Sequence, residues 1–234
     1  MPPRDSLIVA LDVADSSSAR EIVYELGDNV DFYKIGLQLF AAEGSALVRE
    51  LVASGQRIFL DLKFHDIPNT VASAVRSAAA LGVEMLTVHA AGGLPMLKAA
   101  VEAAKGCAKP PLILAVTVLT SLSQDDLGST GITAAIADHV LRLAALAKEA
   151  GCGGVVASPH EVAALRKALG SKMMIVVPGI RPAGSAAGDQ VRTAGPAQAI
   201  QAGASYLVIG RPITEAADKN AALQAILKEI SSGV

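Results

Sequence analysis

The sequence predicts an α/β fold, a single-domain (β/α)8 TIM barrel that spans residues 1–234. Eight short runs rich in β-branched and other apolar residues recur along the chain. Each is followed by a run rich in Ala and Leu, with apolar residues at spacings of three and four, which is typical of a helix. A strand followed by a helix, repeated eight times, implies a parallel sheet, and this chain length favours a closed barrel over an open doubly wound sheet.

The expected elements follow this alternation from one end of the chain to the other. Glycines such as Gly27, Gly82 and Gly151 stand just past most helical runs, where helix C-caps belong. No internal linker or low-complexity tract argues for a second domain. The expected strands are residues 7–13, 32–39, 57–64, 85–90, 112–120, 154–158, 173–180 and 206–211. The expected helices are residues 17–26, 45–54, 70–81, 94–104, 133–150, 161–169, 196–202 and 215–230.

Composition narrows the class of protein. Hydrophobic residues make up 52% of the chain, enough for a large core, and the formal net charge of −2 with scattered basic residues argues against a nucleic-acid partner. The two cysteines, Cys107 and Cys152, have neither metal-ligand nor disulfide-framework spacing. The first residues lack the apolar stretch of a signal peptide, and the longest apolar run, 112–119, is too short to span a bilayer of about 30 Å. We therefore expect a cytoplasmic protein without a membrane partner.

Charged residues lie where an apolar strand should end. In the expected strand 57–64, alternation puts Phe59, Asp61 and Lys63 on one face, opposite a wholly apolar face. Alone, this pattern suits a surface ion pair as well as a functional site. In a barrel, however, catalytic groups gather at the carboxyl ends of the strands, and Asp12 and Lys34 belong to the same rim. The barrel prediction therefore favours an active site.

Asp12, Lys34, Asp61, Lys63 and Asp66 alternate in sign, so each charge can have opposite neighbours. Two unit charges 4 Å apart interact by about 4 kcal/mol at an effective dielectric constant near 20, which keeps a lysine protonated and an aspartate ionised. A protonated Lys63 suits proton donation, whereas Schiff-base chemistry requires a neutral amine. The four histidines form no metal-binding cluster, so no zinc site is expected.

The loops after the last two strands carry the features of a phosphate site. The run Pro178-Gly179-Ile180-Arg181-Pro182 is followed by small residues and Gln190, and Gly210-Arg211 ends the eighth strand. Loops after strands 7 and 8 hold phosphate in many barrels, and an arginine can contact a phosphate through two hydrogen bonds. A closing loop over a phosphorylated ligand is the prediction.

The ten residues 61–70, Asp-Leu-Lys-Phe-His-Asp-Ile-Pro-Asn-Thr, closely resemble the signature of the orotidine 5′-phosphate decarboxylase family. One departure is Ala194-Gly195-Pro196, where family members often have Thr-Pro; it concerns helix capping only. Further blocks resemble that family in its order: Leu11-Asp12, Tyr33-Lys34-Ile35-Gly36, Thr87-Val88-His89-Ala90, Val118-Leu119-Thr120-Ser121, Ser158-Pro159-His160-Glu161, Pro178 to Pro182, Gly188-Asp189-Gln190 and Gly210-Arg211-Pro212.

The resemblance implies a homodimeric barrel that converts orotidine 5′-monophosphate (OMP) to uridine 5′-monophosphate (UMP) and CO2, the last step of pyrimidine nucleotide synthesis, without metal or organic cofactor. It implies that Lys63 protonates C6 of the pyrimidine and that Asp61 and Asp66 lie beside the departing carboxylate. Asp66 and Thr70 would reach into the partner subunit's site. The implied substrate-binding residues are Asp12 and Lys34 for the ribose, Thr120 and Gln190 for the pyrimidine, Arg211 and Gln190 for the phosphate, and Pro178, Arg181 and Gly210 in the adjoining loops.

Two alternatives stay open. The related 3-keto-gulonate-6-phosphate decarboxylase and hexulose-6-phosphate synthase group shares an Asp-x-Lys-x-x-Asp motif and uses Mg²⁺, held by a glutamate in the second strand. This chain has Lys34 at the comparable place, and an ammonium group there opposes Mg²⁺ binding. The other alternative is a non-catalytic barrel that only binds a phosphorylated ligand, although phosphate binding needs none of Asp61, Lys63 and Asp66.

Overall fold

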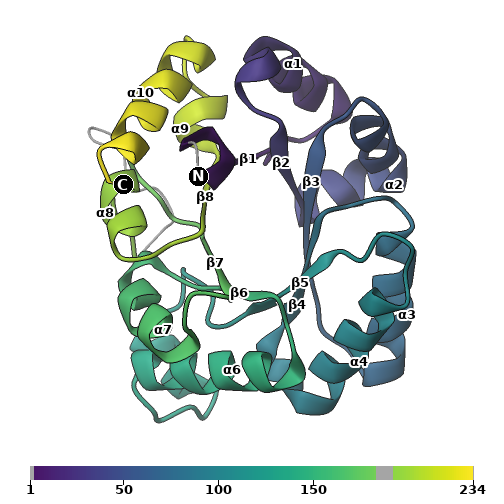
Figure 1. The fold of residues 1–234 in the computed structure, drawn as a ribbon, viewed down its shortest axis with the longest axis vertical. Coiled ribbons are helices and arrows are strands. Elements are labelled where there is room, and N and C mark those ends of the chain that lie inside the picture. The colour runs from purple at the N-terminus through teal and green to yellow at the C-terminus, as the bar shows by residue number, and fades with distance from the viewer. Residues whose placement is uncertain (1–2, 183–191, 234) are drawn as a thin grey trace.

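A closed parallel barrel forms the centre of the protein. The computed structural model describes residues 3–182 and 192–233, in which the strands pair in chain order and β1 closes the barrel against β8. Figure 1 shows the helices as an outer ring around these strands. The barrel fold is confirmed. The strands are β1 (Leu7–Ala10), β2 (Phe32–Gly36), β3 (Arg57–Phe64), β4 (Met85–His89), β5 (Leu112–Val116), β6 (Gly154–Val156), β7 (Met174–Val177) and β8 (Tyr206–Ile209).

The helices follow the strands, with two short additions that the sequence pattern did not predict. One is α5, which begins with a reciprocal capping box between Ser123 and Asp126. The other is α9, one turn directly after β8. The helices are α1 (Ser16–Leu26), α2 (Leu37–Ala53), α3 (Pro68–Ala79), α4 (Gly93–Lys105), α5 (Gln124–Ser129), α6 (Ile136–Ala150), α7 (Val162–Leu169), α8 (Pro196–Gln201), α9 (Arg211–Thr214) and α10 (Lys219–Ser231). None of them is both long and apolar enough to cross a membrane.

Several predicted boundaries were wrong, and burial explains why. The predicted strands 7–13 and 112–120 end earlier, at Ala10 and Val116. Leu11 and Val118 are still buried, because the loops that follow the strands pack against the core. An apolar run therefore does not mark where a strand ends. The predicted helix 45–54 begins earlier, at Leu37, and continues across a kink at Gly44 (φ 65°).

Two apolar layers hold the barrel together. The inner layer fills the barrel, and the outer layer lies between the strands and the helices. β3 shows the alternation predicted for it, because Phe59 belongs to the inner layer while Ile58 and Leu60 belong to the outer one. The inner layer consists of Ile8, Ala10, Phe32, Phe59, Met85, Leu114, Val176, Tyr206 and Val208.

The amino ends of the strands are closed by packed aromatic and charged groups. The Arg57 guanidinium group lies 4.2 Å from the centre of the Phe32 ring and forms an ion pair with Glu84 at 2.6 Å. The Phe32 and Tyr206 rings meet edge to face, 5.9 Å apart. The hydrogen bond to Glu84 raises the pKa of Arg57, so its positive charge is permanent. This packing closes the end of the barrel at which the strands begin, opposite their carboxyl ends.

Candidate active site

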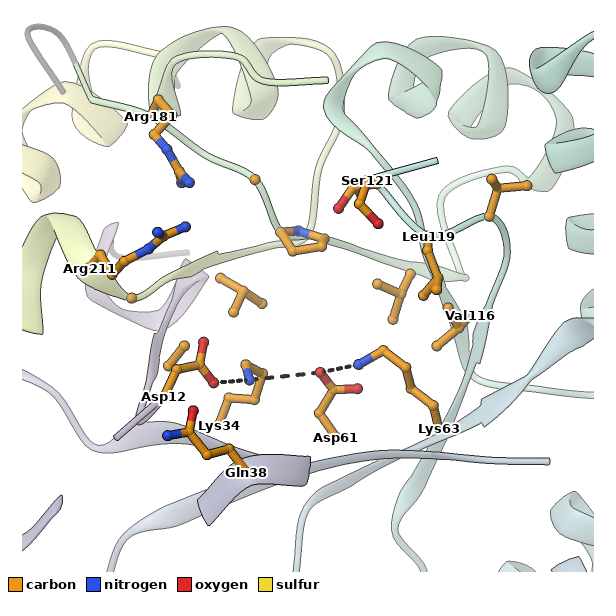
Figure 2. Close-up of a pocket in the computed structure, with 18 of the residues that line it drawn as sticks. Asp12, Lys34, Gln38, Asp61, Lys63, Val116, Leu119, Ser121, Arg181 and Arg211 are labelled. Carbon is orange, nitrogen blue, oxygen red and sulfur yellow. Dashed lines mark hydrogen bonds and ion pairs between the residues drawn. The ribbon is translucent and has the colours of Figure 1, made fainter. Parts of the chain in front are cut away.

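A cavity of about 540 Å³ opens at the carboxyl ends of the strands, within the size range of small-molecule sites. Polar side chains from several strands share its wall, as the sequence predicted for a single rim. Figure 2 shows Asp12, Lys34, Asp61 and Lys63 in one row across this pocket. The predicted site residues that line the cavity are Asp12, Lys34, Asp61, Lys63, Thr120, Pro178, Arg181, Gly210 and Arg211.

The row of charges alternates in sign, as predicted. Lys34 Nζ lies 2.8 Å from Asp12 Oδ1 and 3.8 Å from Asp61 Oδ2, and Lys63 Nζ lies 2.9 Å from the same Asp61 oxygen. The Lys34 and Asp61 side chains are almost buried, with exposed fractions of 10% and 13%. Water screens such pairs poorly, so each ammonium group is stabilised by a neighbouring carboxylate. The array presents a fixed, charged Lys63 to the cavity.

A glycine makes room for the Lys34 ion pair. Gly36 ends β2, and a Cβ atom at this position would lie 2.9 Å from Lys34 Nζ and 3.3 Å from Asp12 Oδ1. Any larger residue would push the ammonium group away from the carboxylate. The run Lys34-Ile35-Gly36 therefore brings a lysine and the space for its partner to the same strand end.

Two arginines lie on the side of the cavity away from Lys63. Arg181 follows β7, where Gly179 has a φ of 76° that glycine adopts without strain, and Arg211 begins α9. Figure 2 shows both guanidinium groups pointing into the pocket, above the Asp12 end of the charged row. Arg181 also donates a hydrogen bond from Nη1 to the Ile180 carbonyl, 2.9 Å away. Two adjacent guanidinium groups suit a dianionic phosphate.

A pair of histidines lies beside the array, outside the cavity lining. His65 and His89 stack with ring centroids 5.2 Å apart and an interplanar angle of 27°. Burial, with smaller contributions from His65 and Lys63, lowers the pKa of His89, so this ring is neutral at neutral pH. A neutral imidazole adds no charge that would compete with Lys63.

Comparison with known proteins shows the family. The model of the orotidine 5′-phosphate decarboxylase / HUMPS family matches residues 5–226. This chain belongs to that family. The chain is 52% identical over 98% of its length to the orotidine 5′-phosphate decarboxylase of Moorella thermoacetica, covering 94% of that protein, and 54% identical over 97% of its length to that of Rhodopseudomonas palustris, covering 95% of it.

Solved structures in this family share the barrel. The crystal structure of orotidine 5′-phosphate decarboxylase from Lactobacillus acidophilus superposes with a TM-score of 0.86 at 41% identity, covering 97% of this chain and 99% of that one. The Pyrococcus horikoshii enzyme superposes with a TM-score of 0.77 at 27% identity, covering 96% of this chain and 99% of that one. The family resemblance inferred from the motifs is therefore confirmed over nearly the whole chain.

Three predicted site residues are not among the described residues that line the cavity. Asp66 and Thr70 lie on the exposed β3–α3 loop and at the start of α3, and neither lines the cavity. Asp66 instead accepts a hydrogen bond at Oδ1 from the Ile67 backbone N–H, 2.6 Å away. Gln190 lies outside the described residues. Their predicted roles remain predictions.

The structure also adds residues that the sequence patterns did not single out. Gln38, Ser121 and Glu215 line the cavity from positions just after β2, β5 and α9. Thr87, on β4, donates a hydrogen bond from its hydroxyl group to Asp61 Oδ1, 3.0 Å away. β3 and β4 pair Phe59 with Met85, which puts Thr87 level with Asp61. The sequence pattern did not single out Thr87, because the pairing of β3 with β4 cannot be read from the two strand sequences.

Proposed function

We propose that Lys63 donates the proton to C6 when this protein converts OMP into UMP and CO2, and that the reaction needs no metal or organic cofactor. The enzyme is a carboxy-lyase that acts on OMP, in keeping with its family. The observation that carries the proposed mechanism is the position of Lys63 Nζ, which lies 2.9 Å from Asp61 Oδ2 on the cavity wall.

The chemistry of the reaction calls for such a group. Loss of CO2 from C6 leaves an electron pair in the plane of the ring, where it is poorly delocalised. A neighbouring positive charge stabilises the developing carbanion, and a positioned acid then supplies the proton. Lys63 can do both, because Asp61 stabilises its ammonium form before the substrate arrives. The C6–CO2 bond electrons then form the C6–H bond with the Lys63 proton.

The rest of the cavity matches the other parts of OMP. Arg181 and Arg211 would bind the phosphate, and Asp12 and Lys34 would bind ribose hydroxyl groups at the Asp12 end of the charged row. Thr120 and Pro178 would contact the pyrimidine, together with Gln190. Binding energy from the remote phosphate can then hold the ring against Lys63, which lowers the entropic part of the barrier.

The second subunit is part of the proposal. Asp66 and Thr70 are exposed in a single chain, and the large apolar side chain of Ile67 between them is 67% exposed. Leu37, the first residue of α2, is 59% exposed. We infer that this surface packs against a second copy of the chain and carries Asp66 and Thr70 into the partner's cavity, beside the substrate carboxylate.

The Mg²⁺-dependent alternative is less well supported by the described residues. Among them, no three His, Cys, Asp or Glu side chains gather into a possible metal site. Lys34 also brings its ammonium group between Asp12 and Asp61, the two carboxylates that could otherwise share a cation. A binding protein without catalysis is disfavoured because phosphate recognition gives no reason for the partly buried Asp61–Lys63 pair.

Loss of OMP absorbance, followed with the purified protein, tests the proposal. We expect rapid turnover by the wild type, unchanged after EDTA treatment, and a loss of at least about 1,000-fold in kcat for Lys63→Ala. Lys172→Ala, at an exposed lysine before β7, is the matched control and should retain full activity. Activity that returned only with Mg²⁺ would support the metal-dependent alternative, and full activity of Lys63→Ala would exclude Lys63 as the proton donor.

A further inference from the structure

Thr87 is a fully buried hydroxyl group directly behind the charged row. It lies on β4 with an exposed fraction of 0%, and it is not part of the cavity wall. Its strand neighbours Leu86 and Val88 face the outer apolar layer, so Thr87 points to the inside of the barrel, like Met85. A hydroxyl group buried among apolar side chains is costly unless it is hydrogen-bonded. The partners of Thr87 therefore indicate why a threonine stands there.

Both partners of Thr87 belong to the proposed catalytic pair. The hydroxyl group donates to Asp61 Oδ1, 3.0 Å away, and accepts from the Lys63 backbone N–H, 2.9 Å away. The other Asp61 oxygen holds Lys63 Nζ at 2.9 Å. Asp61, Lys63 and Thr87 thus form a closed ring of three hydrogen bonds, in which Lys63 is held at its backbone and at its ammonium group.

The backbone of β3 explains why Lys63 needs such support. Lys63 has a φ of 51°, and it is the non-glycine residue with a positive φ in the described part of the chain. Side chains disfavour this left-handed conformation. The pairing with β4 is irregular at the same place, because β3 advances from Leu60 to Phe64 while β4 advances only from Leu86 to Val88. Such a bulge redirects a side chain and leaves a backbone group without its regular strand partner.

We propose that Thr87 is a positioning residue for the decarboxylation: its hydroxyl group holds the β3 bulge and the Asp61 carboxylate in one arrangement, which aims the Lys63 ammonium group at C6. The Lys63 N–H that the bulge takes out of the β3–β4 ladder donates to Thr87 instead. This inference rests on the proposed role of Lys63 as proton donor. Thr87 itself does not touch the substrate.

Two substitutions separate positioning from simple packing. Thr87→Val keeps the shape of the side chain but removes both hydrogen bonds, whereas Thr87→Ser keeps the hydroxyl group and loses a methyl group. If Thr87 only fills space, Thr87→Val should leave kcat unchanged and Thr87→Ser should lower it. If its hydroxyl group positions Lys63, Thr87→Val should lower kcat and Thr87→Ser should nearly preserve it.

The experiment measures kcat and KM for OMP, the dissociation constant of UMP, and the melting temperature of each variant. We expect kcat to fall about 100-fold in Thr87→Val, as for a small misplacement of a reacting group, with KM and UMP affinity within about threefold of wild type. Thr87→Ser should keep kcat within about fivefold. Thr87→Ala replaces the valine variant if the latter does not fold, with the same expected loss.

Several results would overturn the inference. A wild-type kcat in Thr87→Val, an equal loss in Thr87→Ser, or a kcat loss accompanied by loss of UMP binding would each show that the hydroxyl group does not position Lys63. Wild type and Lys63→Ala are assayed alongside. An inactive wild type or an active Lys63→Ala would refute the proposed mechanism and this inference together. If only the Thr87 variants depart from the prediction, the inference about Thr87 is wrong and the proposed role of Lys63 is unaffected.

Discussion

Single residues at the rim of the barrel hold one another in place through opposite charges. Lys34 is the clearest case, because its ammonium group is buried at 2.8 Å from Asp12 and 3.8 Å from Asp61. Removing one member of such a pair leaves a charge without compensation in a poorly hydrated site. The charged row is therefore a unit, and the effects of substitutions within it should not be additive.

Arg211→Ala tests the proposed phosphate site. A hydrogen bond to a charged group contributes about 1.5–3 kcal/mol, so we expect KM for OMP to rise roughly 10- to 100-fold. Arg49→Ala, at an exposed arginine of α2, is the control and should leave KM unchanged. Steady-state kinetics of the two variants check this expectation. An unchanged KM in Arg211→Ala would place the phosphate elsewhere.

The elements of the barrel were largely readable from the sequence, and the reasons for the exceptions are physical. Periodicity identified β3 and its inward face correctly, since Phe59 and Ile58 pack in different layers. The bulge at Lys63 was not predicted, because it depends on how β3 pairs with β4 rather than on the β3 sequence. Thr87 was missed for the same reason. Strand ends were placed too late wherever the following loop is itself buried, as at Leu11.

A buried ion pair connects three loops at the carboxyl ends of the barrel strands. Glu161, after β6, pairs with Arg192, and both side chains are about 90% buried. Arg192 Nη2 also donates to the Leu119 carbonyl in the loop after β5, 3.1 Å away, and Glu161 accepts from the Ser158 N–H. This pair connects the backbone beside Thr120 with the segment that precedes α8.

Glu161→Gln should therefore destabilise the fold. Removing one partner of a buried ion pair costs about 3 kcal/mol or more of unfolding free energy. The control is Glu102→Gln, which removes an exposed pair with Lys105 and should cost less than about 1 kcal/mol. Urea unfolding of both variants measures the difference. Equal stability of the two variants would mean that the buried pair adds nothing to the loops it connects.

At the scale of the whole molecule, the proposal that Asp66 and Thr70 enter a partner's cavity requires an assembly of two chains. We expect a homodimer of about 48 kDa from the 23.8 kDa chain, in the symmetric arrangement common among homo-oligomers. Ile67→Asp should shift the protein toward monomer and lower its activity at low concentration, because a charge replaces an exposed apolar contact.

Tyr24→Asp is the matched control for the dimer. Tyr24 is 88% exposed on α1, outside the β3–α3 loop, so its replacement should leave both mass and activity unchanged. Sedimentation velocity over a range of protein concentrations measures the assembly. A monomeric wild type, or an Ile67→Asp protein that stays dimeric and fully active, would contradict the predicted interface.

A mixture of two inactive variants tests most directly whether Lys63 and the partner's Asp66 form one catalytic array. Lys63→Ala and Asp66→Asn are each expected to be nearly inactive alone. If subunits exchange freely and each site takes Asp66 from its neighbour, half of the dimers are mixed and each contains one intact site, which restores about a quarter of wild-type activity. Activity of the mixture that stays at the level of the separate variants after subunit exchange, shown by native mass spectrometry, would contradict the shared site.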